Sequence, residues 1–284
     1  MLIISCIMVI LAIMVGFSER NTLQTSRMVL TVLVSIGLVF IGSWLLSKVA
    51  LSPIKAAWQK QLDFTADASH ELRTPLATIQ TNLDVVMSNP ATTVESQMKW
   101  LKNIEIENKR MSTLVSDLLF LSRADTDEIT LEKKVFDLSL IFAEIIATYD
   151  AVIKQKGISL TSSITNGVII KGDKDKIRQL LIILLDNAIK YNKDSGDLRI
   201  SLFLNEDDVN IKISDTGIGI NRGEMEKIFN RFYRGEKSRQ KNPDGSGLGL
   251  AIAKMIATEH KGTIFVDSKI GEGSDFTVRL PLSC

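Results

Sequence analysis

One histidine in a helical segment has the side chain and the surroundings for covalent or proton-transfer chemistry. His70 lies one residue past Ser69, a position on the apolar seam of the helix predicted below, so its imidazole is expected on the exposed shoulder of that helix. Pro75 follows five residues later and removes the amide that would bond the carbonyl of Glu71, which bends the helix beside the imidazole. An exposed imidazole can carry a proton or form a covalent intermediate, although a single histidine on a helix is more often an ordinary surface residue.

Glycine-rich turns further along the chain have the residue types of a phosphate-binding site. Asp215 continues the inward phase of an apolar strand, and the glycines that follow it let the backbone turn closely around a bound group. An aspartate that merely closes a strand would give the same local pattern. A second turn at 245–250 leads into a helical segment, and the amides of a glycine loop at a helix N-terminus bind phosphate. It is neither a Walker loop nor a Rossmann turn, because no Gly-Lys-Ser/Thr follows it and no strand-turn-helix surrounds it.

The elements that must position this second group of residues mix helix and strand. Apolar and polar residues alternate over 198–204 and over the next apolar run, with a polar turn between them, which predicts a β-hairpin with one buried face. Helical periodicity is found at 138–154 and 173–191. Asn187 lies late in the second helix, and its amide carbonyl is an oxygen ligand that suits Mg²⁺. We therefore predict an α/β domain over residues 129–284.

The elements that carry His70 are two helices with one apolar seam each. In the first, the seam positions are spaced alternately by four and three residues, at Trp58, Leu62, Thr65, Ser69, Leu72, Leu76, Ile79, Leu83 and Val86. Asn89-Pro90 breaks this helix, and Thr92 or Thr93 can cap the second. In the second helix the same four-and-three spacing, interrupted by Glu107, is found at Trp100, Ile104, Met111, Leu114, Leu118 and Leu121. Because such seams are buried well in a four-helix bundle, we predict a homodimer; a hairpin packed on another domain of the chain is the alternative.

Two stretches near the N-terminus have the length and composition of transmembrane helices. Residues 1–18 and 28–47 contain no charged side chain, and each is close to the roughly 30 Å thickness of a bilayer's hydrocarbon core. The first could instead be a secretory signal, but it has no basic leader and no small-x-small cleavage site, so an anchor is expected. The loop at 19–27 is too short to fold into a sensor domain. A helical hairpin at 48–128 is expected to continue directly from the second membrane helix, with only Pro53 as an interruption.

Composition disfavours two other classes of function. The net charge of +1, with 24% charged residues, gives no basic footprint for nucleic-acid binding. Cys6 and Cys284 have no metal-ligand neighbours, and we expect neither a structural disulfide nor a metal site at them. The second histidine, His260, is expected to be structural.

The segment from Phe64 to Leu76, FTADASHELRTPL, resembles the phosphoacceptor box of bacterial two-component sensor histidine kinases. The resemblance implies that His70 is phosphorylated and that Glu71 accepts the imidazole proton as a general base. In this family a carboxylate-x-x-threonine pattern supports the reverse reaction, dephosphorylation of the partner protein. Glu71 and Thr74 occupy these places, so Thr74 is expected to orient the attacking water.

Four later blocks resemble, in their order, the ATP-binding domain of the same kinases, which is related to gyrase and mismatch-repair ATPases. They are an asparagine box at 186–191, the Asp215 box, an aromatic box at 228–234 and a glycine box at 245–250. The resemblance implies an α+β multidomain protein with two transmembrane helices, a dimeric four-helix-bundle phosphoacceptor domain and an α/β sandwich that binds ATP and Mg²⁺. A mobile lid is expected at about 221–246, in which Arg231 and Arg234 could reach the phosphates or be ordinary surface residues.

The same resemblance assigns roles within the nucleotide site. Asp215 is expected to accept a hydrogen bond from the adenine amino group, and Asn187 to hold Mg²⁺. Lys190 and Tyr191 are expected to flank the nucleotide. The remaining contacts are expected from the glycine-rich turns, at Gly217, Gly219, Gly245, Gly247, Leu248 and Gly249.

One position departs from the family pattern. The family commonly carries an asparagine four residues before the magnesium asparagine, where this chain has Ile183. The two positions share a helix face, so the site has lost a ligand or a ligand-orienting group, although water can fill a Mg²⁺ position. We expect weakened rather than abolished kinase activity. A kinase-weakened phosphatase or binding partner of the response regulator is the alternative, while the His70 box argues against a gyrase-type ATPase.

Together these features predict a bacterial sensor kinase that autophosphorylates His70 from ATP. The phosphoryl group is expected to pass to an aspartate in the receiver domain of a response regulator, with phosphatase activity in addition. The need for ATP places the catalytic part in the cytoplasm, on a multi-pass protein of the inner (plasma) membrane. The short outer loop points to sensing within the membrane or through a companion membrane protein.

Overall fold

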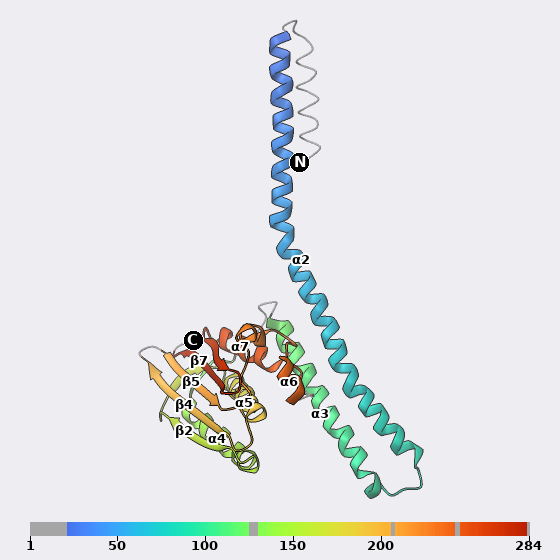
Figure 1. Cartoon of the computed structure of the whole chain (residues 1–284), viewed down its shortest axis with the longest axis vertical. Coiled ribbons are helices and arrows are strands. Elements are labelled where there is room, and N and C mark those ends of the chain that lie inside the picture. The colour runs from blue at the N-terminus through green and yellow to red at the C-terminus, as the bar shows by residue number, and fades with distance from the viewer. Residues whose placement is uncertain (1–21, 125–129, 206–207, 242–244, 283–284) are drawn as a thin grey trace. The chain divides into compact units, whose positions relative to one another are not determined.

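The structure, a computed structural model, describes residues 22–124, 130–205, 208–241 and 245–282 (Figure 1). The chain divides into two units, residues 1–65 and 66–284, and one long helix, α2 (Thr22–Ser88), contributes to both. α2 continues without a break through Pro53, where an interruption was expected. A proline removes one helical hydrogen bond, which a long helix can tolerate because the bonds on either side of it remain.

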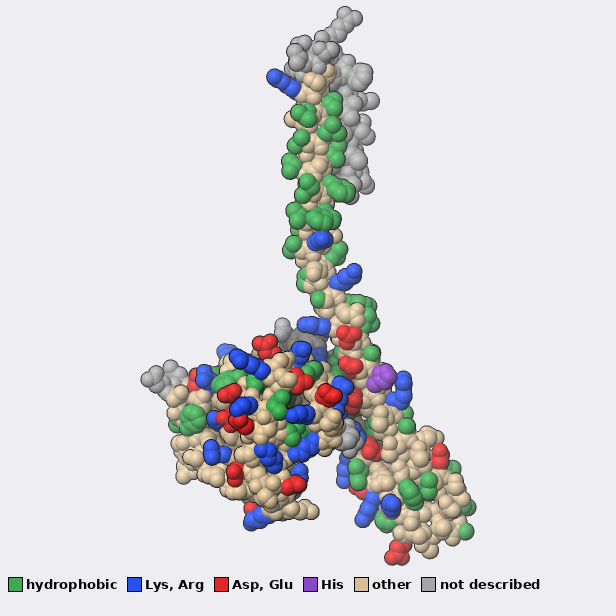
Figure 2. Space-filling view, viewed as in Figure 1, with side chains coloured by type: hydrophobic (Ala, Val, Ile, Leu, Met, Phe, Trp, Pro, Cys, Tyr) green, Lys and Arg blue, Asp and Glu red, His purple; other side chains and the backbone are tan. Residues whose placement is uncertain are grey.

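In the first unit, the 28–47 stretch of α2 is apolar, and most of its side chains are exposed (Figure 2). An 18-residue window reaches a mean hydropathy of 2.4. In this helix, the hydroxyls of Thr31 and Ser35 each donate to a backbone carbonyl four residues earlier at 2.8 Å, so these polar groups are satisfied inside the helix. Among the described residues, this is the one helix long and apolar enough to cross a membrane, and it contains the predicted span at 28–47. The predicted first span, 1–18, lies outside the described residues.

In the second unit, the end of α2 and the helix α3 (Val94–Ala124) form a hairpin. The N–H of Ser96 donates to Thr93 Oγ1 (3.4 Å) at the start of α3, which confirms one of the two predicted caps. Gln97 Nε2 donates to the carbonyl of Asn89 at 2.9 Å and ties α3 to the turn. The break predicted at Asn89-Pro90 is therefore confirmed.

Only part of the predicted seam of α2 faces α3 within one chain. Pro75 and Asn82 are buried in the hairpin. The seam residues Leu62, Leu76 and Leu83 are 49%, 54% and 41% exposed. A single hairpin thus leaves an apolar strip uncovered, which is the surface that a second copy covers in a four-helix bundle. The homodimer stays a prediction.

The C-terminal part is built on a five-stranded sheet with the order β2-β4-β5-β7-β6. Its strands are β2 (Ser159–Ile164), β4 (Asp197–Asn205), β5 (Asp208–Asp215), β7 (Gly273–Pro281) and β6 (Thr263–Lys269). β2 and β4 are parallel, and the other pairs are antiparallel. β1 (Lys134–Asp137) and β3 (Ile169–Gly172) form a separate antiparallel pair. The predicted hairpin is confirmed, since Leu198 pairs with Asp215 and Ile200 with Ile213.

Three helices pack on the apolar face of this sheet: α4 (Leu138–Gln155), α5 (Lys174–Tyr191) and α7 (Gly249–Glu259). Alternate strand residues such as Ile200 and Ile211 are buried in one cluster with Leu180 and Leu184 of α5. Three short elements, η1 (Arg222–Glu224), η2 (Lys227–Phe229) and α6 (Glu236–Lys241), lie between β5 and α7. The result is the mixed helix-and-sheet domain that the sequence predicts.

Aspartates fix where two of these helices begin. Asp137 caps α4, since its side chain accepts from the N–H of Ser139 at 2.8 Å. Asp173 caps α5 in the same way. The N–H of Asp173 in turn donates to Nε2 of His260 at 2.9 Å, while Nδ1 of His260 lies 2.8 Å from the carbonyl oxygen of Ile256. Burial lowers the pKa of His260, so the neutral ring makes both hydrogen bonds, and the expectation of a structural histidine is confirmed.

Candidate active site

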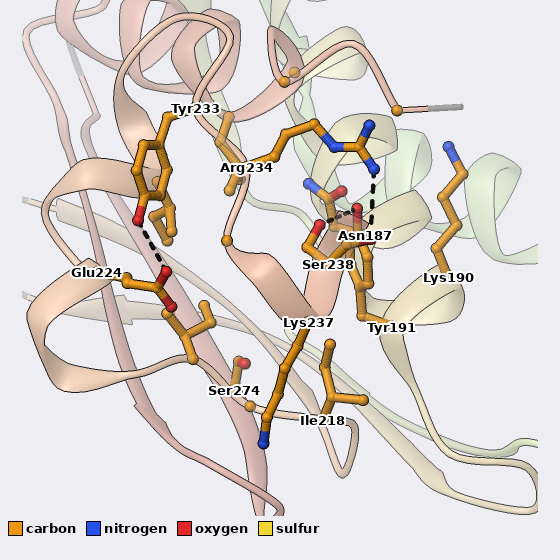
Figure 3. A pocket seen from close by; sticks show the side chains of 18 of the residues that line it. Asn187, Lys190, Tyr191, Ile218, Glu224, Tyr233, Arg234, Lys237, Ser238 and Ser274 are labelled. Carbon is orange, nitrogen blue, oxygen red and sulfur yellow. Dashed lines mark hydrogen bonds between the residues drawn. The ribbon is translucent and has the colours of Figure 1, made fainter. Parts of the chain in front are cut away.

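A pocket of about 360 Å³ lies beside α5, and this helix forms one of its walls. Ile183, Asp186, Asn187 and Lys190 line it, and their spacing of three, one and three residues places them on one face of the helix. Tyr191, the last residue of α5, lines it as well (Figure 3). One helix face therefore presents a carboxylate, an amide and an ammonium group to the same pocket.

Asp215 lines the pocket from the end of β5. It is 9% exposed, and the N–H of Gly217 donates to its Oδ1 at 2.8 Å. Burial raises the pKa of Asp215 to about 6, against the opposite effect of hydrogen bonds from the backbone amides of Gly217 and Ser274. At neutral pH the group is thus a carboxylate with little water around it, which suits a ligand that brings an amino group.

Gly217 and Gly219, the two glycines after Asp215, differ in their position relative to the pocket. Gly217 is not among the lining residues and acts on the pocket through its hydrogen bond to Asp215. A Cβ at Gly217 would lie 2.2 Å from the carbonyl oxygen of Tyr191, so no larger residue fits. Gly219 lines the pocket with a φ of +66°, and a Cβ there would lie 2.0 Å from the carbonyl oxygen of Lys269.

The glycine-rich turn before α7 also borders the pocket. Gly245, Gly247 and Gly249 line it. Gly247 has a φ of +71°, and a Cβ there would lie 2.8 Å from the carbonyl carbon of Phe232. The first turn of α7 has N–H groups without helical partners, which suit phosphate oxygens. Leu248, in contrast, is fully buried in the core and does not line the pocket.

The segment predicted as a lid, 221–246, contributes much of the remaining lining and is held by side-chain hydrogen bonds (Figure 3). Tyr233 Oη donates to Glu224 Oε1 at 2.9 Å. Ser238 Oγ of α6 donates to Tyr191 Oη at 2.8 Å. The short helix α6 is therefore tied directly to the end of α5.

Three cationic side chains of this segment have different partners. Lys241 Nζ donates to the carbonyl of Tyr191 at 3.2 Å, which satisfies a carbonyl at the C-terminal end of α5. Arg234 lines the pocket, and its Nη2 donates to a backbone carbonyl of α6 at 3.4 Å. Arg231 is not a lining residue, and its Nη2 donates to a backbone carbonyl of α3 at 3.2 Å. Of the two arginines, Arg234 is the one placed to meet a phosphate in this pocket.

His70 lies on the part of α2 that belongs to the second unit, where its side chain is exposed. Thr74 is also exposed, while Glu71 is half-buried and Pro75 is buried. His70 and Thr74 are four residues apart, so the imidazole and the hydroxyl share one helix face, with the carboxylate of Glu71 adjacent.

Two family models match the two parts of the chain that carry these residues. The "His Kinase A (phospho-acceptor) domain" matches residues 60–127, and the "Histidine kinase-, DNA gyrase B-, and HSP90-like ATPase" matches residues 172–283. The chain belongs to the sensor histidine kinases of two-component systems. The pocket of this histidine kinase thus lies in its ATPase-type domain, and His70 lies in its phosphoacceptor domain.

Other sensor kinases resemble this histidine kinase over most of its length. Sensor histidine kinase RppB of Synechocystis sp. is 34% identical over 250 residues, which are 88% of this chain and 55% of RppB. Sensor protein SrrB of Staphylococcus aureus is 32% identical over 223 residues, 78% of this chain and 38% of SrrB. The structure of Acinetobacter baumannii histidine kinase AdeS is 28% identical with a TM-score of 0.61, over 75% of this chain and 98% of that chain. The chain spans about half or less of the length of these two curated relatives.

The pocket residues of the histidine kinase fit ATP and a divalent cation. Lys190 and Arg234 supply positive charge for phosphates, and the carboxylate of Asp215 suits the adenine amino group. The side-chain oxygens of Asn187 and Asp186 are donors that Mg²⁺ accepts.

Several lining residues were not predicted from the sequence, among them Asp186, Lys237 and Ser238. Asp186 had a detectable signal, because it follows Ile183 by three residues and so shares its helix face. Tyr149 of α4 donates to Asp186 Oδ1 at 2.9 Å, and burial with the nearby charge of Asp186 raises the pKa of Tyr149. Lys237 and Ser238 fall inside the predicted lid, but this polar segment has no periodicity that would single them out.

Proposed function

We propose that this histidine kinase transfers the γ-phosphoryl group of ATP to an imidazole nitrogen of His70. The N–P bond forms as the bond between the γ-phosphorus and the bridging oxygen of ADP breaks, and Glu71 accepts the imidazole proton. One observation carries the proposal: a single chain holds an exposed histidine in a phosphoacceptor domain and a cation-lined, glycine-bordered pocket in an ATPase-type domain.

The pocket residues have distinct tasks in this proposal. Asp215 accepts a hydrogen bond from the adenine amino group, and Tyr191 flanks the nucleotide. Lys190, Arg234 and the first-turn amides of α7 bind phosphate oxygens. Asn187 would hold Mg²⁺, which when bound neutralises phosphate charge. Positioning and charge neutralisation provide most of the rate enhancement of an enzymatic phosphoryl transfer. The covalent chemistry required of the protein is therefore limited to the nucleophile, His70.

A second step passes the phosphoryl group from His70 to an aspartate of a response regulator's receiver domain. The exposure of His70 supports this step, because the partner must reach the phosphorylated ring. Thr74, one helical turn away and also exposed, would orient water for the phosphatase reaction.

The cellular setting is part of the proposal. The apolar strip on the hairpin, which includes Leu76 and Leu83, supports a homodimer through a four-helix bundle. The apolar part of α2 supports an anchor in the bacterial plasma membrane. We place the hairpin domain at 48–128 and the catalytic domain at 129–284, both in the cytoplasm, with the signal sensed within the membrane or through a companion membrane protein.

A kinase-weakened phosphatase is the second candidate, and Ile183 is the observation that favours it. Ile183 lines the pocket where the family commonly has asparagine, and an isoleucine offers no ligand to a cation. The phosphatase role of Glu71 and Thr74 does not depend on that position.

The test uses the full-length chain in detergent, incubated with γ-labelled ATP and Mg²⁺ beside a His70→Gln variant. We expect label on the wild-type protein that is stable to alkali and labile to acid, and none on His70→Gln. Label retained by His70→Gln would show that the acceptor is wrong. If neither protein is labelled although both bind ATP, the phosphatase candidate takes first place.

A further inference from the structure

Helix α5 forms one wall of the pocket. At position 183 it has an isoleucine where the family commonly has an asparagine, but Asp186, another residue with side-chain oxygens, lies nearby on the same helix. Ile183 packs beside the glycine-rich turn, since a Cβ on Gly249 would lie 3.3 Å from its Cγ2. Three residues further along the same helix face stands Asp186, directly before Asn187. On this face the carboxylate and amide oxygens are therefore those of Asp186 and Asn187.

A hydrogen bond from a neighbouring helix orients Asp186. Tyr149 Oη of α4 donates to Asp186 Oδ1 at 2.9 Å. This contact engages one carboxylate oxygen and restricts rotation of the group, and Asp186 is one of the residues that line the pocket. No hydrogen bond or ion pair joins Oδ2 of Asp186 to any other residue in the described part of the chain. Asp186 and Asn187 are consecutive lining residues, and a carboxylate held by one oxygen while its second oxygen is uncommitted has the arrangement of an oriented metal ligand.

We propose that Asp186, positioned by Tyr149, supplies the second protein oxygen for the Mg²⁺ of bound Mg-ATP, directly or through one water. It thereby takes over from the asparagine that the family commonly has at the position of Ile183. The inference rests on the proposed function, because it concerns the cation that accompanies ATP. Asp186 is a ligand in this proposal, and Tyr149 is a positioning residue that touches neither the metal nor the nucleotide.

A carboxylate ligand has an electrostatic consequence that an asparagine ligand lacks. With Mg²⁺ present, the negative charge of Asp186 attracts the cation and strengthens nucleotide binding. Without Mg²⁺ the same charge repels the phosphates and weakens it. The neutral substitution Asp186→Asn should therefore weaken nucleotide binding with Mg²⁺ present, but should not weaken it without Mg²⁺. A residue that only supports α5 through Tyr149 would weaken binding in both.

The experiment measures the Kd of the full-length chain in detergent for fluorescent trinitrophenyl-ATP, once with saturating Mg²⁺ and once with EDTA. We expect Asp186→Asn to raise the Kd in Mg²⁺ about tenfold or more, and to leave it unchanged or lower it in EDTA. Tyr149→Phe should raise the Kd in Mg²⁺ by up to about tenfold, with little effect in EDTA. Asp150→Asn is the matched control, because Asp150 is the neighbour of Tyr149 and pairs with Lys154 at the surface (2.7 Å).

Rescue keeps the proposal testable if Asp186→Asn is poorly folded. Adding Ile183→Asn to Tyr149→Phe places an amide oxygen one turn before Asn187, and we expect it to restore most of the Mg²⁺-dependent affinity. Equal weakening in Mg²⁺ and EDTA, or an unchanged Kd in Mg²⁺, would overturn the role of Asp186 while leaving the proposed function in place. A wild-type chain that binds no nucleotide under either condition would overturn the proposed function and this inference together.

Discussion

Ser238 donates a 2.8 Å hydrogen bond to the hydroxyl of Tyr191, so the short helix α6 is attached to the last residue of α5. Lys241 adds a second attachment through the carbonyl of the same Tyr191. Residues of α6 line the pocket, so a bound nucleotide would lie against this segment. Nucleotide exchange is therefore expected to depend on how easily these contacts open.

Ser238→Ala should speed the release of bound nucleotide. A neutral hydrogen bond contributes about 1 kcal/mol, so its loss should raise the dissociation rate of trinitrophenyl-ATP by about fivefold in a stopped-flow chase. Ser201→Ala, which changes a serine on β4 outside the pocket, is the control and should leave the rate unchanged. An unchanged rate for Ser238→Ala would mean that the contact with Tyr191 does not limit opening.

Asp215 should make nucleotide affinity depend on pH. Its pKa of about 6 in the folded protein is raised by burial, and an adenine amino group that donates to the carboxylate should lower that pKa again. The bound state then holds fewer protons near pH 6, so binding releases protons and affinity falls as the pH is lowered from 7 to 5. Calorimetry at pH 6 in two buffers of different ionisation enthalpy measures this release, and proton uptake would contradict the assignment.

The same residue should lower stability at neutral pH. Because the folded pKa of Asp215 lies above the ordinary aspartate value of 3.8, its contribution to stability is full below pH 3.8 and lost as the pH rises through about 6. Asp215→Asn should therefore raise the free energy of unfolding at pH 7.5 by at most about 3 kcal/mol, with no gain at pH 4. It should also weaken ATP binding. Thermal melts at the two pH values check this, and an equal effect at both would exclude ionisation as the cause.

Glu107 is expected to destabilise the hairpin. Its Oε2 is buried and forms no hydrogen bond with any described residue, while Arg110 Nη1 lies 3.7 Å away. Glu107→Met should raise the free energy of unfolding by about 1–2 kcal/mol, because an imperfectly paired buried charge costs more than an apolar side chain of similar size. Glu105→Met removes an exposed glutamate paired with Lys109 on the same helix and should change stability by less than about 0.5 kcal/mol. A lower melting temperature for Glu107→Met would show that the carboxylate has a partner, such as one in the dimer.

The two histidines should respond to substitution in opposite ways. His260→Leu leaves the N–H of Asp173 and the carbonyl of Ile256 without their partner, so we expect a loss of about 3 kcal/mol in the free energy of unfolding. The lowered pKa of His260 means that this contribution is present above pH 6.5 and is lost as the pH falls below that value. His70→Gln, on the exposed surface, should leave the melting temperature unchanged and abolish labelling. Denaturation curves and the labelling assay on the same preparations distinguish the two roles.

Much of the fold and of the site could be predicted because local spacing carries it. The alternation of apolar residues placed Asp215 on the inner face of β5, and the structure has it there, 9% exposed. The four-and-three rhythm placed His70 one step off the seam, and its side chain is exposed. Residues three or four apart on a helix and two apart on a strand share a face whatever the rest of the chain does. The break at Asn89-Pro90 is local in the same sense.

The tertiary structure decided what distant segments do to one another. Tyr149 and Asp186 are 37 residues apart, and Ser238 and Tyr191 are 47 apart, so no periodicity links either pair. Gly217 and Leu248 belong to the predicted motifs, yet one supports Asp215 from outside the pocket lining and the other is buried in the core. Within a motif, the backbone geometry fixes the relative positions of residues that are close in the sequence. Which oxygen or hydroxyl meets which partner depends on how helices pack across a sheet, and only the folded arrangement of the whole domain determines that.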